Sequence, residues 1–433
     1  MNTALTKRKL DYSSFPVLLM AMALLRGALD LAYLGFINPV YEEHFLSFKY
    51  NYNPTQYFLS WLCYLLCSVT LRGRLIEFVD FFLLFTVIIL IAPITSVWGM
   101  DVQRPIEPLA ATLFAFFILL IFSRSRIIKA PYFPTIKNSR IFLLIISWIL
   151  VAFLITWFIY SGGASTLNFD PNKVYLFREA NSKIVDVGFL AYLNLWVQKF
   201  FIIFLIVYSL YKRQFLVLVL LLIIQVFFYG VTTHKIILFL PLMSIGVWYY
   251  FRRTDNLATL PMVIFIVIVL AYTIYKYYGI EMPAAMLIRR TFYVPAGMTF
   301  EWFSFFSENP MVYWSDEALS LLFEYPYDRP IPYVVGITLE NEDLAANNGL
   351  VSAGYAHAGW FGIFIYALVL GYIVRIINVF CRKGIPLWMA LALTIGPIKT
   401  ALTDSDLLTS ITSHGLLFSV IIIILFRNRG ASE

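Results

Sequence analysis

The sequence predicts an all-α protein that crosses a membrane about twelve times. Of its 433 residues, 61% are hydrophobic and only 13% are charged, and the mean hydropathy is +0.80. Soluble globular domains carry about 25% charged residues. The apolar residues also occur in runs of about 18–25, the length that an α-helix needs to cross about 30 Å of hydrocarbon. We therefore expect a polytopic membrane protein.

Short charged segments separate the apolar runs and define the expected spans. These are 14–37, 55–71, 78–99, 106–123, 141–161, 187–211, 214–230, 236–251, 258–278, 353–380, 386–402 and 408–426. Lys and Arg gather in every second connection, at 7–9, 72–74, 124–140, 212–213, 252–253, 382–383 and 427–429. Because cytoplasmic loops are enriched in Lys and Arg, both termini are expected in the cytoplasm. The same rule accounts for most of the net charge of +7, so no nucleic-acid partner is expected.

Two connections on the opposite side of the membrane are long, residues 162–186 and residues 279–352. Loops longer than about 15 residues are usually functional or disordered. The larger loop is rich in Trp, Phe, Tyr and Leu, so we expect it to form short amphipathic helices on the membrane surface or over the spans. The predicted organisation is one transmembrane domain, residues 1–433, with an elaborated outer face.

Polar residues inside the predicted spans are costly to bury and are therefore functional candidates. Arg26 and Asp30 are four residues apart on the first span, and we expect them to neutralise each other. Cys63 and Cys67 have the same spacing, but packing of small buried side chains is favoured over a metal site. The four histidines lack the spacing of metal ligands, so the sequence predicts no metal site.

Several cations lie on the outer side, where the charge rule disfavours them. Arg178 lies in the medium loop, Lys235 in the tight turn TTHK, and Arg289 and Arg290 begin the segment RRTFYVPAG in the large loop. Arginine matches phosphate oxygens with its planar fork, and lysine acts as a compact point charge. We expect these side chains to bind a lipid phosphate or pyrophosphate. The alternative is that they pair with the carboxylates of the large loop.

A glycine-rich segment, NNGLVSAGYAHAGWFG (347–362), leads from the large loop into the tenth span. Its glycines allow the backbone to approach a neighbouring helix or a ligand closely. His357 lies about one turn into this helix, and it is expected to act as a general acid or base, to bind phosphate, or to serve a structural role.

The arginine pair in RRTFYVPAG, the aromatic stretch EWFSFFSENP and the glycine-rich segment together resemble the large periplasmic loop of Wzy-type O-antigen and repeat-unit polymerases. The resemblance implies a membrane glycosyltransferase of the GT-C type in the bacterial inner (cytoplasmic) membrane, with its active site facing the periplasm. Its donor and acceptor would both be undecaprenyl-pyrophosphate-linked oligosaccharides. A chain-length regulator protein is a candidate partner, and no cofactor is expected because the pyrophosphate linkage already stores the energy for transfer.

The resemblance also implies roles for individual residues. Arg289, Arg290 and Arg178 would bind the donor pyrophosphate. The charge pattern adds Lys235 as a further candidate phosphate ligand. An acceptor hydroxyl needs a general base, for which the candidates are His357, Glu301 and Asp404.

Three other functions stay open at this point. A ligase that transfers the finished polymer onto lipid A core would use the same arginine chemistry. A flippase for lipid-linked oligosaccharides would need cations along many spans, whereas the spans contain few, and it would not need the large loop. A glycosyltransferase that uses a polyprenyl-monophosphate sugar would usually carry an acidic motif in its first outer loop, where Glu42 and Glu43 give a weak match.

Overall fold

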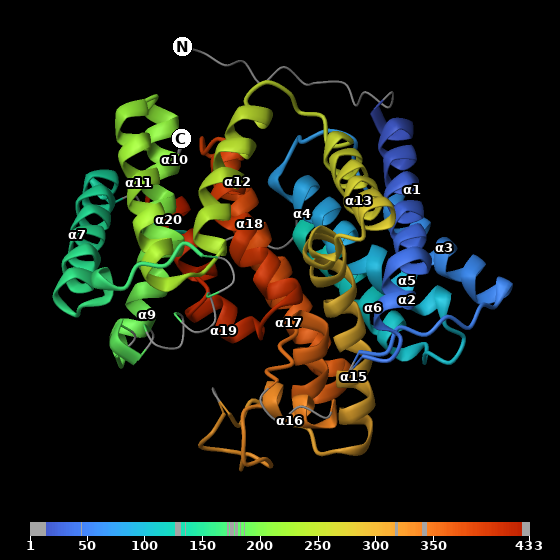
Figure 1. Cartoon of the computed structure of the whole chain (residues 1–433). Coiled ribbons are helices and arrows are strands. Elements are labelled where there is room, and N and C mark those ends of the chain that lie inside the picture. Colours follow the sequence, from blue (N-terminus) through green and yellow to red (C-terminus); the bar gives the residue numbers. More distant parts are fainter. Residues whose placement is uncertain are drawn as a thin grey trace. The chain divides into compact units, whose positions relative to one another are not determined.

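The computed structural model describes residues 14–44, 46–125, 131–134, 136–170, 173, 177, 181, 183–185, 187–316, 319–339 and 344–426. Within these ranges the regular secondary structure is helical (Figure 1), and the β-type pairing consists of two isolated bridges, Asn51–Asp101 and Arg74–Asn256. The prediction of an all-α protein is confirmed. The chain divides into two compact units.

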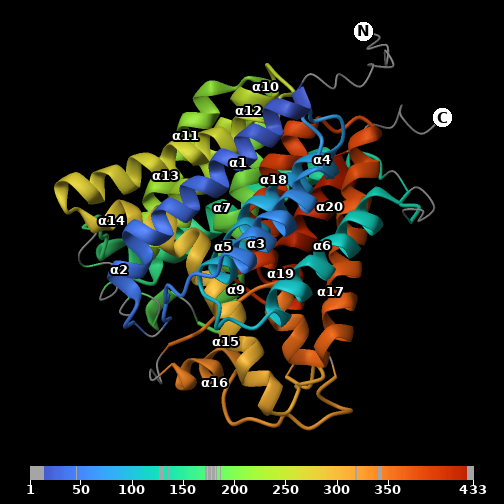
Figure 2. The same cartoon turned by 90° about the vertical axis from the view of Figure 1, so that its right-hand side faces the viewer.

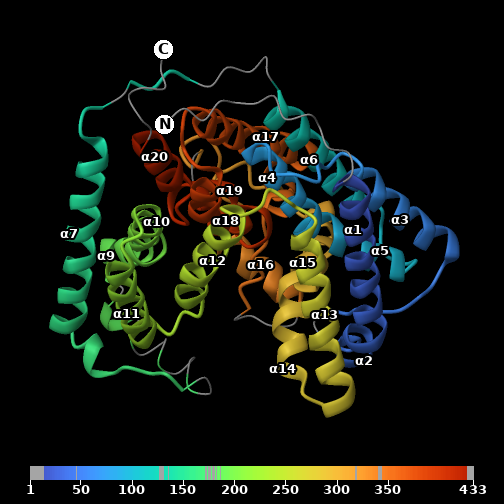
Figure 3. The same ribbon diagram turned by 90° about the horizontal axis from the view of Figure 1, so that it is seen from above.

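Unit 1 comprises Met1–Ile128, Asp255–Arg375 and Ala401–Leu407. Its helices are α1 (Ser14–Ala32), η1 (Tyr33–Ile37), α2 (Asn38–Tyr41), α3 (Pro54–Ser68), α4 (Phe78–Thr86), η2 (Val87–Ile91), α5 (Ala92–Met100), α6 (Glu107–Arg124), α13 (Thr259–Tyr278), α14 (Glu281–Ala284), η5 (Ala285–Tyr293), α15 (Val294–Glu308) and α16 (Ile331–Thr338). Helices α1 and α13 run side by side (Figure 2), and α2 and α14 lie at one end of this pair (Figure 3).

Unit 2 comprises Lys129–Thr254, Ile376–Thr400 and Leu408–Glu433. Its helices are α7 (Ser139–Tyr160), η3 (Gly163–Ser165), α9 (Phe189–Trp196), η4 (Val197–Phe201), α10 (Ile202–Lys212), α11 (Phe215–Thr232), α12 (Ile236–Phe251), most of α19 (Leu407–Thr412), and α20 (Leu416–Phe426). Helix α10 packs against α7, α11 and α12. Two helices contribute to both units, α17 (Leu350–Arg382) and α18 (Leu387–Thr403).

Eight helices of the described residues are long and apolar enough to cross a membrane. They are Ser14–Tyr41, Phe78–Met100, Glu107–Arg124, Ser139–Tyr160, Phe189–Lys212, Phe215–Thr232, Thr259–Tyr278 and Leu350–Arg382. Three shorter apolar helices overlap with further predicted spans, namely Ile236–Phe251, Leu387–Thr403 and Leu416–Phe426. The chain is thus a polytopic membrane protein, while the number of twelve spans, the cytoplasmic termini and the GT-C-like fold stay predictions.

The segment predicted as one large loop, 279–352, is only partly a loop. Residues 281–308 form a continuous helix through α14, η5 and α15, here called helix 281–308. Most of α15 is buried, because Trp, Phe and Met side chains pack into unit 1. One short helix in this region is α16, which lies near the lower end of α15 in Figure 1.

The predicted span 408–426 is also not one helix. It forms α19 and α20, which are separated at Gly415. Gly415 has a φ of +83°, and a Cβ atom there would lie 2.0 Å from the ring of Phe200. Only glycine adopts this conformation without a steric penalty, so the helix is interrupted at this position.

Candidate functional site

The glycine-rich segment forms a sharp reversal inside α17. Ala358 and Gly359 have non-helical backbone angles, and Gly359 has a φ of +59°. A Cβ atom on Gly362 would lie 2.0 Å from the carbonyl oxygen of Gly354, although in a straight helix two residues eight apart are separated by about 12 Å. The backbone therefore turns back on itself at this point, so that Gly354 contacts Gly362 and Ile363, and glycine is required at the contact.

His357 is the last residue before this reversal, and it is buried. Its Nδ1 accepts a hydrogen bond of 3.1 Å from the backbone N–H of Trp314, and its Nε2 lies 3.2 Å from Oδ2 of Asp406. Because Nδ1 accepts, the neutral imidazole carries its proton on Nε2 and donates it to Asp406. The Trp314 ring stacks on the imidazole, with 5.1 Å between centroids.

Asp406 receives a second hydrogen bond from the same region. The hydroxyl of Tyr366 donates to Oδ2 of Asp406 at 2.6 Å, and the indole N–H of Trp314 donates to the Tyr366 oxygen at 3.0 Å. The Asp406 side chain is 21% exposed, compared with 2% for His357. We call His357, Asp406, Tyr366 and Trp314 the His357 cluster. Within it, Asp406 and Trp314 are partly exposed, whereas His357 and Tyr366 are buried.

Asp316 lies in the loop close to this cluster. The residue as a whole is exposed, but partial burial of its carboxyl group raises the pKa of that group. The nearby His357 and a backbone hydrogen bond lower this pKa, and the nearby Asp406 raises it. The net effect is a pKa above the ordinary value for aspartate. A pair of neighbouring carboxyl groups in different environments is a common arrangement in sites of acid–base chemistry.

The loop that carries Trp314 is held in an unfavourable conformation. Tyr313 and Trp314 both lie in the left-handed region, with φ of 50° and 56°, which costs of order 1–3 kcal/mol per non-glycine residue. The backbone N–H groups of Val312 and Tyr313 donate to the carbonyls of Ala356 and His357, each at 2.9 Å. The reversal in α17 frees these carbonyls, and the loop uses them to stay attached.

The predicted arginine pair lies in η5 of helix 281–308. The guanidinium of Arg289 is half-buried and sits over the ring of Tyr41, 4.2 Å from its centroid, and burial lowers its pKa. Arg290 is exposed. The π-helical turn places these consecutive arginines in different surroundings, one against α2 and one toward solvent.

The other predicted site residues lie in separate places. Glu301 pairs with Arg104 at 3.1 Å, and Asp404 accepts a hydrogen bond of 2.9 Å from the Thr403 hydroxyl. Lys235 is exposed at the start of α12 in unit 2, and Arg178 lies outside the described residues. Of the predicted bases, only His357 therefore belongs to the His357 cluster.

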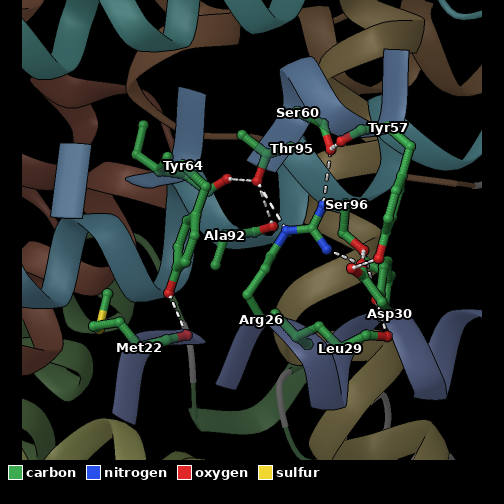
Figure 4. Close-up of polar contacts among 12 residues, drawn as sticks. Met22, Arg26, Leu29, Asp30, Tyr57, Ser60, Tyr64, Ala92, Thr95 and Ser96 are labelled. Atoms are coloured by element: carbon green, nitrogen blue, oxygen red, sulfur yellow. Dashed lines mark hydrogen bonds and ion pairs between the residues drawn. The ribbon is translucent and has the colours of Figure 1, made fainter. Parts of the chain in front are cut away.

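A second polar network is buried within unit 1 (Figure 4). Arg26 forms the expected ion pair with Asp30, and it also donates to the hydroxyls of Thr95 at 3.3 Å and Ser60 at 3.2 Å. Asp30 accepts further hydrogen bonds from the hydroxyls of Ser96 at 2.7 Å and Tyr57 at 3.0 Å. The prediction that Arg26 and Asp30 neutralise each other is confirmed.

Sequence reasoning did not select Asp406, Tyr366 or Trp314 as site residues. A signal for Asp406 was present, because it shares its short turn with the predicted Asp404. Tyr366 and Trp314 carried no such signal, since they read as ordinary aromatic residues of a span and a loop.

Within the described ranges, no group of three or more His, Cys, Asp or Glu side chains is arranged to hold a metal ion. No protein-family model, curated protein or solved structure matches the chain. The relationship to repeat-unit polymerases therefore stays a prediction, and its support is the resemblance of the sequence motifs.

Proposed function

We propose that the chain is a membrane glycosyltransferase that joins undecaprenyl-pyrophosphate-linked oligosaccharide repeat units into a surface polysaccharide such as O-antigen. The observation that carries the proposal is the His357 cluster. It holds a partly exposed carboxylate, Asp406, close to a second carboxyl group, Asp316, whose pKa is raised. A positioned proton acceptor beside a group that keeps its proton is suited to general acid–base chemistry.

The transfer proceeds in one displacement. The acceptor hydroxyl gives its proton to Asp406 while its oxygen forms a bond to the anomeric carbon of the donor sugar. The bond from that carbon to the pyrophosphate oxygen breaks, and the pyrophosphate leaves with the electron pair. Cationic side chains stabilise the charge that develops on it, and the candidates that the sequence predicts for this role are Arg289, Arg290, Arg178 and Lys235. No nucleotide or metal cofactor is needed.

We assign the base to Asp406 and a positioning role to His357. Both ring nitrogens of His357 are engaged, Nδ1 by the backbone of Trp314 and Nε2 by Asp406. Its N–H and the Tyr366 hydroxyl fix the orientation of the carboxylate. Glu301 is a weaker candidate because it forms an ion pair with Arg104.

The proposed setting follows from the substrate. A lipid-linked oligosaccharide is presented on the outer face of the bacterial inner membrane, so the His357 cluster would face the periplasm. A chain-length regulator protein is the proposed protein partner, because a polymerase acting alone sets no fixed product length.

Product analysis of the purified protein tests the proposal. The protein in lipid nanodiscs is supplied with lipid-linked repeat units extracted from its source cells, without nucleotide, and the products are separated by gel electrophoresis. We expect a ladder of products that differ by one repeat. Transfer only after lipid A core is added would identify a ligase instead. Absence of transfer under both conditions would overturn the assignment as a glycosyltransferase.

A further inference from the structure

The buried network around Arg26 is joined to helix 281–308 by one residue, Tyr293. Its hydroxyl donates to the backbone carbonyl of Leu29 on α1 at 2.6 Å and lies 3.2 Å from the hydroxyl of Ser96 on α5. The proton of Ser96 is used in its hydrogen bond to Asp30 and that of Tyr293 in its hydrogen bond to Leu29, so the two hydroxyl oxygens are in polar contact beside these two hydrogen bonds. Tyr293 is fully buried, and its ring packs 5.5 Å from that of Tyr33.

We call Arg26, Asp30, Ser96 and Tyr293 the buried anchor. Arg26 is 0% exposed and Asp30 5% exposed, and their contacts reach α3 and α5 as well as α1. An ion pair buried in this way is weak evidence for added stability, because desolvation of both charges offsets their attraction. A polar network whose members all have partners does fix one arrangement of the elements that it joins. The anchor therefore fixes how α1, α3, α5 and helix 281–308 align.

The anchor meets helix 281–308 at a distinctive point. Tyr293 is the last residue of η5, a nine-residue π-helical segment. Such wide turns are rare, usually span a single turn, and occur often at functional sites. This one contains Arg289 and Arg290, and Arg289 stacks on Tyr41 at the far end of the helix that begins with α1. A shift of η5 toward ordinary α-helical geometry would rotate both arginines away from their present surroundings.

We infer that the buried anchor is a positioning site: through Tyr293 it holds the π-helical register of η5 and so sets where Arg289 and Arg290 present their charges. All four anchor residues are buried, and we assign none of them to substrate contact. The inference rests on the proposed function only for the consequence in catalysis. Its structural part stands on the contacts themselves.

Hydrogen exchange in the purified protein tests the structural part. Tyr293→Phe keeps the ring and removes both hydroxyl contacts. We expect backbone amides in 285–293 to exchange about tenfold faster in this variant, while α1 and α5 exchange as before. The matched control is Tyr64→Phe, because Tyr64 is equally buried and its hydroxyl also donates to a carbonyl of α1, that of Met22, at 2.8 Å.

A second variant keeps the test open if Tyr293→Phe fails to fold. Ser96→Ala breaks the connection between Asp30 and Tyr293 and leaves Asp30 with Arg26 and Tyr57. We therefore expect a smaller increase in the amide exchange rates of residues 285–293. Unchanged exchange rates in 285–293 in both variants would overturn the inference. So would an increase of these rates in Tyr64→Phe as large as in Tyr293→Phe.

Transfer activity separates this inference from the proposed function. In Tyr293→Phe we expect kcat/KM for the lipid-linked donor to fall about tenfold, with no such loss in Tyr64→Phe. If the unmodified protein forms no product but exchange in 285–293 responds as expected, the proposed function fails and the positioning role stands. If the protein is active and Tyr293→Phe has unchanged exchange and unchanged kcat/KM, the positioning role fails.

Discussion

Replacing Gly362 by alanine should disrupt the reversal in α17. The added Cβ would lie 2.0 Å from the carbonyl oxygen of Gly354 and 3.4 Å from the Cβ of Ala358. The atom that must yield at 2.0 Å is backbone, so no side-chain rotation relieves the clash. The two parts of the helix would separate at the reversal, and His357 is the last residue before it.

Overpacked cores usually lose about 1–3 kcal/mol, and a backbone clash belongs at the upper end of that range. A loss of about 3 kcal/mol corresponds to a fall in Tm of about 6–12 °C for a domain of roughly 150–250 residues. The separation would also weaken the contact between His357 and Asp406, so transfer activity should fall together with stability.

Thermal unfolding of the purified protein, followed by tryptophan fluorescence, measures the loss. The matched control is Gly27→Ala in the interior of α1, because nothing lies within 4 Å of the Cβ position there. Alanine is favoured over glycine in a helix by about 0.5–1 kcal/mol, so this control should hold or raise the Tm. A Gly362→Ala protein as stable as the control would refute the folded-back geometry.

Three further outcomes are expected. Arg290→Ala should reduce transfer at least tenfold, while Arg290→Lys should retain part of the activity because lysine keeps the charge but lacks the planar fork. Equal activity of Arg290→Ala and the parent protein in the gel assay would exclude a role of Arg290 in phosphate binding. Because the pKa of Asp316 is raised, the folded protein binds the proton of this carboxyl group more tightly than the unfolded chain does. The protonated carboxyl group therefore stabilises the fold fully below pH 3.8, and this stabilisation is lost as pH rises through the pKa of the folded state. Asp316→Asn should therefore unfold at a higher temperature than the parent at pH 7 and at a similar one at pH 3.5, whereas a lower Tm at pH 7 would contradict the shift. Glu301→Gln removes a partly exposed ion pair, and such pairs typically contribute about 1 kcal/mol or less to stability, so the variant should stay active. Loss of transfer without a fall in Tm would instead identify Glu301 as a catalytic group.

The sequence predicts the membrane helices well because their signal is local. An apolar run of the right length specifies a span whatever it packs against. The ion pair of Arg26 and Asp30 was predictable for the same reason, since residues four apart on a helix share a face. In each case the information lies within a few turns of the chain.

Helix 281–308 shows where local reasoning fails. The sequence places it in the outer loop 279–352, as short amphipathic helices that carry the charged residues Arg289, Arg290 and Glu301. In the folded chain Arg289 stacks on Tyr41 and Glu301 pairs with Arg104, and these partners come from distant segments. Composition alone does not reveal which charges will find partners after folding.

The candidate site was predictable only in part, for a related reason. His357 and Asp406 are 49 residues apart, and their contact depends on the reversal at Gly359. The glycine-rich run indicated a close backbone approach, but the sequence did not reveal that α17 turns back on itself. Without that turn, His357 reads as an isolated histidine near the end of a span.

The most direct test of the account compares Asp406→Asn with Asp404→Asn. Both substitutions remove one negative charge from the same short turn, and only Asp406 belongs to the His357 cluster. A positioned general base contributes roughly 10²–10⁴-fold to a rate. We predict that Asp406→Asn slows ladder formation by about 100-fold or more, while Asp404→Asn stays within about threefold of the parent. Equal rates for the two variants, or a greater loss in Asp404→Asn, would contradict the assignment of Asp406 as the base.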